Sequence, residues 1–220
     1  MGRGKDFVRL LGATVVTAVL MPACYASDYN SVPSDLPGVV ITVVDQGPAL
    51  SSARSFALPD TIIEVPVGSN TLDHAFDQQI IANVRAHMVA LGWKDVGTNP
   101  SAAPDVVLLV AAATRIQTGV AYVDWFGAWG TLPYWGPGVD GSWTWGVPGG
   151  AVPYAFQAGT ILITMLDRRT RNVNLKTIPL LWAAGIDGVV TTAASTAERA
   201  LVGIDQGFAQ SPYLVRVPLP

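Results

Sequence analysis

Few residues in this sequence have side-chain chemistry that could serve a reaction or a metal ion. The two histidines, His74 and His87, lie thirteen residues apart, which on a helix separates them by about 20 Å at 1.5 Å per residue. They cannot share a metal ion, and we expect both to be surface or half-buried helix residues. The chain contains one cysteine, which excludes an internal disulfide and a multi-cysteine zinc or iron–sulfur site.

Two aspartates, Asp124 and Asp140, flank an aromatic cluster and could in principle act as a glycosidase pair of general acid and second carboxylate. Aspartates are common in loops, however, and the sequence has no Gly-x-Ser-x-Gly elbow, phosphate-binding loop or His-Glu-x-x-His pattern. The sequence therefore predicts no catalytic residue, no metal site, no cofactor and no enzymatic activity.

The aromatic cluster lies in a Gly- and Pro-rich segment, residues 122–154, that shows no helical or strand period. It contains five of the seven tryptophans: Trp125, Trp129, Trp135, Trp143 and Trp145. Exposed tryptophans could stack on sugar rings, enter a membrane interface or accept a partner peptide. Alternatively, the rings fold back over the sheet and give the loop a small core. The five rings are the candidate ligand or partner surface.

The single cysteine, Cys24, follows a segment with the shape of a secretory signal. Arg3, Lys5 and Arg9 precede an uncharged run over residues 10–21, which is too short to span a bilayer core of about 30 Å. Residues 20–24, Leu-Met-Pro-Ala-Cys, resemble a bacterial lipobox, in which the lipidated cysteine becomes the first residue of the mature protein. The alternative is conventional cleavage after Ala26.

The lipobox predicts a signal peptide over residues 1–23, an acylated Cys24 (palmitate or a similar chain), and a Ser-, Asp- and Pro-rich tether over 24–38. Tyr25 stands where an aspartate would favour retention in the inner membrane. We therefore expect a lipid-anchored protein of the bacterial envelope, at the outer membrane and facing the periplasm.

Charge and composition restrict the partners. The chain has 50% hydrophobic and 13% charged residues, a mean hydropathy of +0.38 and a net charge of −3. Loss of residues 1–23 would leave 10 basic and 15 acidic residues, a net charge of −5. This balance argues against a nucleic-acid partner and disfavours docking of a basic patch on an anionic surface. Sixteen prolines and 22 glycines favour a β or α+β protein over a helical bundle.

Hydrophobic periodicity and turn residues predict a series of elements. The expected strands cover residues 39–44, 54–58, 61–65, 104–113, 155–166 and 174–182, and the expected helices cover 71–91 and a segment that starts near Ser195.

Several finer features accompany these elements. Asn70 is the expected N-cap of the first helix and Gly92 follows its end, whereas Ser195 and Glu198 match a capping box for the last helix. The strand over 104–113 is apolar throughout and should be central, and Asp105 at its entrance should be a turn or cap residue.

The last two strands should form a hairpin whose tip, residues 167–172, carries three arginines: Arg168, Arg169 and Arg171. Such a tip could bind a phosphate or a lipid headgroup, but a solvated tip is the commoner outcome.

The order of elements and several motifs resemble domain-of-unknown-function family 4136, a group of bacterial lipoproteins. The matching residues are Ser55-Phe56-Ala57, Leu91-Gly92-Trp93, Pro104-Asp105-Val106, the run from Gly159 to Asp167, Leu181-Trp182-Ala183-Ala184-Gly185, and Phe208 with Ser211-Pro212. The resemblance covers about residues 39–213. It implies a lipid anchor and a tether, and it supplies no catalytic residue.

The sequence thus predicts one α+β domain over residues 39–220, with a mainly antiparallel sheet covered on one face by two helices and a Trp-rich insertion at about 122–154. The expected role is that of a non-catalytic structural or binding protein whose partner is an envelope protein or a glycan. The alternative is a periplasmic carbohydrate-binding or carbohydrate-active protein that uses the Trp-rich loop.

Overall fold

The computed structural model describes residues 40–45, 47–65, 72–97, 103–113, 117–120, 135, 144–146, 153–156, 159–189 and 193–216. The predicted signal peptide, the predicted tether and Cys24 lie outside these residues. None of the described helices has the length and apolar character needed to cross a membrane.

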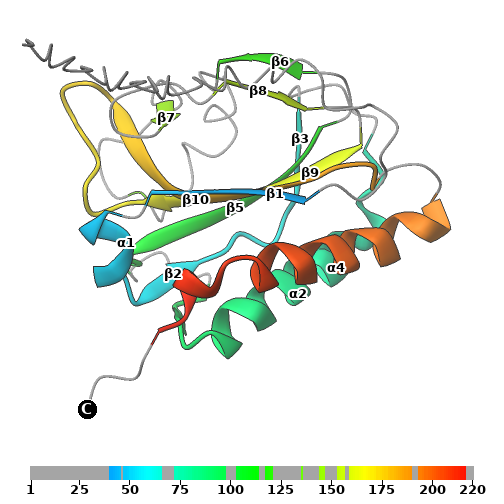
Figure 1. Ribbon diagram of the computed structural model, residues 1–220, viewed down its shortest axis with the longest axis horizontal. Coiled ribbons are helices and arrows are strands. Elements are labelled where there is room, and N and C mark those ends of the chain that lie inside the picture. Colours follow the sequence, from blue (N-terminus) through cyan, green and yellow to red (C-terminus); the bar gives the residue numbers. More distant parts are fainter. Residues whose placement is uncertain are drawn as a thin grey trace, which may run out of the picture.

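The centre of the fold is an eight-stranded sheet (Figure 1). Its strands are β1 (Val40–Val44), β2 (Ser55–Ala57), β3 (Ile63–Val65), β4 (Lys94–Asp95), β5 (Val106–Ala113), β7 (Thr144–Gly146), β9 (Thr160–Asp167) and β10 (Thr177–Ile186). The order is β1-β10-β9-β5-β2-β4, with β3 also paired to β5 and β7 to β10. A separate two-stranded sheet joins β6 (Gln117–Val120) to β8 (Pro153–Phe156).

The sheet is mixed: its long strands pair antiparallel, in line with the prediction, and short strands add parallel pairs that were not predicted. Strands β1, β10, β9 and β5 pair antiparallel, but β2 with β4, β2 and β3 with β5, and β7 with β10 are parallel. The helix α2 (Asp77–Ala90) lies between β2 and β4 in the chain. A helical crossover returns the chain in the same direction, which makes the two strands parallel.

Strand β5 has the central place that its sequence predicts, and all eight of its residues are buried. Successive side chains point to opposite faces of a strand, so β5 supplies two cores. One set (Val106, Leu108, Val110, Ala112) joins the cluster beneath the helices, and the alternate set (Val107, Leu109, Ala111, Ala113) joins a cluster on the other face.

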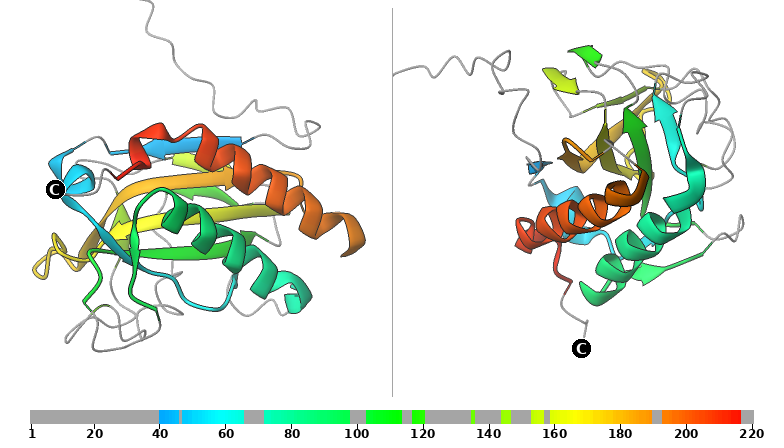
Figure 2. Two further views of the ribbon diagram at one scale, coloured as in Figure 1. Left: turned by 90° about the horizontal axis from the view of Figure 1, so that it is seen from below. Right: turned by 90° about the vertical axis from the view of Figure 1, so that its right-hand side faces the viewer.

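Two helices, α2 and α4 (Ala193–Ala209), lie side by side on one face of the sheet (Figures 1 and 2), as predicted. The predicted stripe of α2 is confirmed, since Ile80, Val84 and Met88 are buried. The helical segment begins later than expected. A 3-10 turn, η2 (His74–Phe76), precedes α2, and Asp73 caps it by accepting a hydrogen bond from the Ala75 amide at 3.0 Å. The expected cap, Asn70, lies outside the described residues.

Helix α4 owes its close contact with the sheet to two glycines. A Cβ atom on Gly203 would lie 2.2 Å from Ile186 Cγ2, and one on Gly207 would lie 3.4 Å from Ala184 Cβ. These positions therefore allow the helix to approach β10, although glycine lowers helix propensity. The helix begins at Ala193, two residues before the predicted start, so Ser195 lies inside it.

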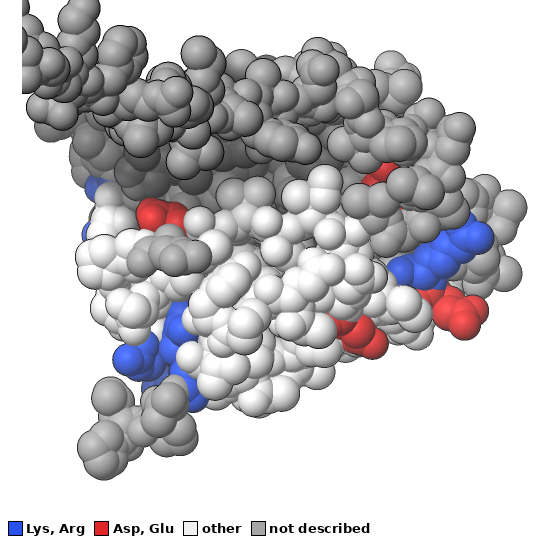
Figure 3. Space-filling model, viewed as in Figure 1, with Lys and Arg blue, Asp and Glu red and all other residues white. Residues whose placement is uncertain are grey.

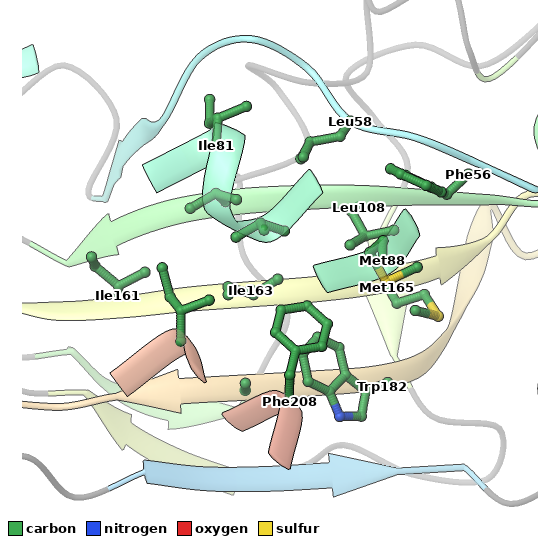
Figure 4. Packing of buried hydrophobic residues seen from close by; sticks show 14 of the residues in the cluster. Phe56, Leu58, Ile81, Met88, Leu108, Ile161, Ile163, Met165, Trp182 and Phe208 are labelled. Atoms are coloured by element: carbon green, nitrogen blue, oxygen red, sulfur yellow. The ribbon is translucent and has the colours of Figure 1, made fainter. Parts of the chain in front are cut away.

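The core beneath the helices is centred on aromatic and sulfur-containing side chains (Figure 4). Trp182 packs on Phe208 with ring centroids 5.3 Å apart, and its Nε1 donates to Ser211 Oγ at 2.9 Å. The indole of Trp93 also has a partner, the carbonyl of Leu214, at 2.8 Å. Because buried indole N–H groups need acceptors, these bonds fix how the chain after α4 lies on the core.

The predicted hairpin forms between β9 and β10, but its first strand is shorter than expected. The predicted run over 155–166 is divided, since β8 pairs with β6 and Gly159 has a φ of +92°.

The Trp-rich segment also contains a strand that was not predicted, β7, paired with β10. A strand of three residues is too short to show a period, so its partner alone defines it.

Candidate functional site

Three arginines from separate parts of the chain converge on the short helix α1 (Pro48–Ser52). Arg169 Nη2 donates to the Ala49 carbonyl at 2.6 Å, Arg216 Nη2 to the Leu50 carbonyl at 2.9 Å, and Arg54 Nη1 to the Ser51 carbonyl at 2.6 Å. The last carbonyls of a helix lack partners within the helix and carry partial negative charge. The guanidinium groups satisfy these acceptors and hold α1 against the end of the sheet.

Basic side chains are concentrated at this end of the molecule. Ten of the 13 Lys and Arg residues remain when Arg3, Lys5 and Arg9 are set aside. Six of the ten belong to this end, which we call the basic end: Arg54, Arg168, Arg169, Arg171, Lys176 and Arg216. Figure 3 shows basic side chains gathered near the position of α1 in Figure 1.

The acidic residues of the basic end are engaged in local contacts. Asp45 accepts from the Gly47 amide at 3.0 Å, and the fully buried Asp167 pairs with Arg169 Nε at 3.0 Å. Among the described residues, Arg169 is the one arginine of this end whose guanidinium group has a carboxylate oxygen within 4 Å. Burial, followed by the charge of Arg171, lowers the pKa of Arg168. The basic end therefore carries excess positive charge.

The tip of the β9–β10 hairpin is wider than predicted and consists of residues 168–176. Asn172 and Thr177 exchange two backbone hydrogen bonds, of 2.8 and 3.0 Å, and the Leu175 amide donates to Asn172 Oδ1 at 3.0 Å. The predicted solvated tip is correct for residues 172–176, which are exposed. It is wrong for Asp167, which is fully buried. Arg169 is exposed, and it fastens the hairpin to α1 through its guanidinium group.

Asp105 is the turn residue that the sequence predicts. Its Oδ2 accepts from the backbone amides of Arg54 at 2.8 Å and of Ser55 at 3.0 Å. Burial raises the pKa of Asp105, but these hydrogen bonds outweigh burial and hold the pKa below its ordinary 3.8. The carboxylate thus joins the entrance of β5 to that of β2.

The depressed pKa of Asp105 gives a pH-dependent prediction. A carboxylate with a lowered folded-state pKa stabilises the fold above its unfolded pKa, and this stability is lost as the pH falls through the folded value. We expect Asp105→Asn to lower the free energy of unfolding by about 1–3 kcal/mol at pH 7, with the difference from wild type shrinking below pH 3.8. Urea unfolding at pH 7, 4 and 3 measures this, and an equal difference at all three values would contradict it.

The structure describes two of the five candidate tryptophans, and they lie in different environments. Trp135 is fully buried, in the cluster on the face of the sheet opposite the helices. Of the two possibilities that the sequence leaves open, Trp135 thus follows the one in which the ring packs on the sheet. Trp145 lies in β7, where it is the partner of Ile178. Trp125, Trp129, Trp143 and the aspartates Asp124 and Asp140 lie outside the described residues.

The two histidines are at the surface or half-buried, as predicted, and each has its own aspartate. His74 Nδ1 lies 2.8 Å from Asp77 Oδ2. His87 Nε2 lies 2.6 Å from Asp205 Oδ1, and its ring stacks on Phe208 at 4.7 Å. The His87 contact joins α2 to α4. Among the described residues, no three His, Cys, Asp or Glu side chains form a group that could hold a metal ion.

The order of elements described above matches a known family. A family model described as Domain of unknown function (DUF4136) matches residues 40–213, from the first residue of β1 to η4 (Pro212–Leu214). The chain belongs to the DUF4136 family. Among curated proteins, none is significantly similar to it.

One solved structure supports the fold, and two others are more distantly similar. A DUF4136 family protein from Bacteroides thetaiotaomicron has 24% identity and a TM-score of 0.57, over 82% of this chain and 99% of that one. A PelC dodecamer from Paraburkholderia phytofirmans has 16% identity and a TM-score of 0.39, over 82% and 99%. A PDZ domain protein from Parabacteroides distasonis has 11% identity and a TM-score of 0.37, over 80% and 36%.

The sequence did not predict that basic residues from three parts of the chain gather at the basic end of this DUF4136 domain. Four of its six residues belong to the hairpin tip, whereas Arg54 and Arg216 are 162 residues apart in the chain and meet at the carbonyl of Ala53, the residue after α1. The only local signal was the Arg-rich tip itself. Guanidinium groups in such a cluster can bind phosphate or carboxylate groups in a bidentate manner.

Proposed function

We propose that this DUF4136 protein is held in the bacterial cell envelope by a lipid on Cys24, at the outer membrane facing the periplasm, where its domain serves as a non-catalytic structural or binding module. The observation that carries the proposal is the position of the single cysteine. It follows directly on an uncharged run preceded by three basic residues, as a lipidated cysteine does.

The use of polar side chains in the described domain supports a structural or binding role. Asp105 holds two backbone amides, and Asp77 accepts from the Ile62 amide at 3.1 Å. Arg85 bridges two carboxylates, Asp60 at 3.0 Å and Asp95. These groups hold strands and helices together, whereas a general acid or base must reach a substrate.

Substitution of Cys24 tests the anchor. Cells grown with an alkyne analogue of palmitate should incorporate the label into wild-type protein and not into Cys24→Ala. Wild type should float with outer-membrane vesicles, because several acyl chains on one cysteine anchor a protein durably. Mass spectrometry of the mature protein should find an N-terminal, acylated residue 24.

A matched change in the predicted tether, Ser27→Ala, should leave both the label and the fractionation unchanged. Unmodified Cys24 in a soluble mature protein, or cleavage after Ala26, would contradict the proposal. Recovery of labelled protein in the inner-membrane fraction would keep the lipid anchor and overturn the location.

A further inference from the structure

We propose that the tip of the β9–β10 hairpin, residues 168–176, is a direct contact with the surface of an anionic lipid layer. In this contact the exposed aliphatic side chains of the tip enter the lipid interface, and the neighbouring basic side chains bind headgroup phosphates. The inference goes beyond the proposed function, since it concerns the folded domain and holds whether or not Cys24 carries a lipid.

The first observation is the exposure of two aliphatic side chains at the apex. Val173 is 66% exposed and Leu175 is 70% exposed, the highest values among the exposed large hydrophobic residues of the described chain. Both lie in the four-residue loop closed by Asn172 and Thr177. Aliphatic side chains at the apex of a narrow projection can enter the headgroup region while the backbone of the strands stays outside it.

The second observation is the charge around this apex. Arg171 and Lys176 flank the two aliphatic residues, and Arg168 and Arg169 follow directly on the end of β9. The one carboxylate of the hairpin, Asp167, is fully buried and directed to Arg169. Basic residues beside a hydrophobic apex attract an anionic lipid surface. The overall acidic charge of the chain therefore does not describe the charge at this end.

The third observation is that the tip is held in place by the fold. Arg169 bonds to the Ala49 carbonyl and to Ser52 Oγ, and the Arg168 amide donates to the Asp105 carbonyl at 3.2 Å. The hairpin thus presents its apex on a fixed base. A preformed surface loses little conformational freedom when it binds.

The distance from the proposed anchor allows both contacts on one membrane. The sixteen residues from Cys24 to the one before Val40 can extend over about 50 Å at about 3.3 Å each. Strand β10, which runs from the tip to the residue paired with Val40, has ten residues and hence a length of about 33 Å. The tip can therefore reach the layer in which Cys24 would be anchored.

Vesicle binding by the unlipidated chain tests the inference separately from the anchor. The protein is the chain from residue 24 onward, which contains every described element, with Cys24→Ser. Flotation with vesicles of phosphatidylethanolamine and phosphatidylglycerol, 70 to 30, should show binding that weakens as salt is raised. Vesicles of phosphatidylcholine alone should bind at least about tenfold more weakly, since each basic residue near an anionic surface contributes about fivefold in affinity.

Two pairs of tip variants separate charge from insertion. Arg171→Gln with Lys176→Asn should weaken binding by about 20-fold or more, and asparagine suits the φ of +50° at position 176. Val173→Thr with Leu175→Gln should weaken it by about tenfold. The matched controls on α4, Arg199→Gln and the exposed Val202→Thr, should bind as wild type does. Melting temperatures should be unchanged in all four proteins.

A fluorescent label reports insertion directly. Because Cys24→Ser removes the only cysteine, the exposed Asn174 can be changed to cysteine and labelled with a nitrobenzoxadiazole dye. The emission should shift to the blue with the anionic vesicles, whereas the same label at Gln210 on the turn after α4 should not shift.

Three results would overturn the inference: no binding of wild type to the anionic vesicles, equal binding by wild type and all tip variants, or binding that depends on Arg171 and Lys176 alone with no blue shift. The last result would show that charge alone attracts the tip to the vesicles and that Val173 and Leu175 do not enter the lipid interface. Loss of the Cys24 anchor in cells, with vesicle binding retained, would contradict the proposed function alone.

Discussion

Trp135→Ala is expected to lower the free energy of unfolding by about 3–5 kcal/mol, the range found when a large aromatic core residue is replaced by alanine. The reason is the position of the ring, which is fully buried among aliphatic residues of β5, β9 and β10, including Leu109, Leu166 and Leu180. The surrounding strands are paired on both sides and cannot close the cavity, so the cost should lie near the upper end. Urea unfolding followed by circular dichroism measures the change.

The conservative variant Trp135→Phe should recover roughly half of this loss, because it keeps most of the buried apolar area. Glycan binding distinguishes the two roles of Trp135, because a ring that only stabilises the core has no direct effect on the affinity for glycans. If Trp135→Ala keeps wild-type stability and abolishes a glycan-dependent fluorescence change, the ring belongs to a ligand surface and its burial in the core is refuted.

The elements with strong periodicity could be predicted from the sequence. The apolar run of β5 requires a central strand, because such a run has no polar side to present to water. The stripe of α2 and the φ of +87° at Gly92 follow from the spacing of apolar residues and from the glycine preference at a helix end. In each case the signal is local, since the residues that define the element are its own neighbours.

Features that depend on distant partners could not be predicted in this way. The parallel pairing of β3 with β5 and of β7 with β10 is decided by where the chain returns to the sheet. The sequence predicts β3 itself as a strand, but it says nothing of the partner. Gly203 illustrates the same limit. Its local effect is a loss of helix propensity, but its role is the contact with Ile186, which belongs to another element.

The candidate site shows how charge depends on the fold. Net charge sums over the whole chain and indicates an acidic protein, whereas folding places Arg54 and Arg216 beside the Arg-rich tip. Because screening limits electrostatic interactions to about 8–10 Å in physiological salt, a partner near the tip responds to these local cations. The prediction from net charge therefore concerns the chain as a whole, and the vesicle experiment tests whether it holds for this end of the domain.

Arg216→Ala should lower the free energy of unfolding by about 2–4 kcal/mol. The side chain is 7% exposed, its Nε and Nη2 donate to the carbonyls of Ala53 and Leu50 at 3.0 and 2.9 Å, and its guanidinium lies 4.0 Å from the centre of the Trp93 ring. Removal takes away two hydrogen bonds donated by a charged group, each worth about 1.5–3 kcal/mol at most, and a cation–π contact. The loss stays below the full cost of unpaired acceptors, because the Leu50 carbonyl still accepts from the Ala53 amide and the Ala53 carbonyl from Arg54 Nη1. Chemical denaturation at pH 7 checks the value.

The charge of Arg216 is needed for these contacts and is present at neutral pH. Burial, and then the nearby charge of Arg54, lower the pKa of Arg216 to about 10, so the effect of Arg216→Ala should not change between pH 6 and 8. Arg216→Lys should recover only part of the stability, because one ammonium group cannot reach both carbonyls and lie flat on Trp93.

The matched control is Arg199→Ala, an exposed arginine with one long contact of 3.5 Å to the Gly188 carbonyl, which should change stability by less than about 0.5 kcal/mol. Equal effects of the two substitutions would show that Arg216 does not hold α1. Vesicle binding of Arg216→Ala should equal that of wild type as long as the variant stays folded, because the tip is fastened mainly through Arg169. This result would show that Arg216 supports the basic end, whereas the residues of the tip contact the lipid surface.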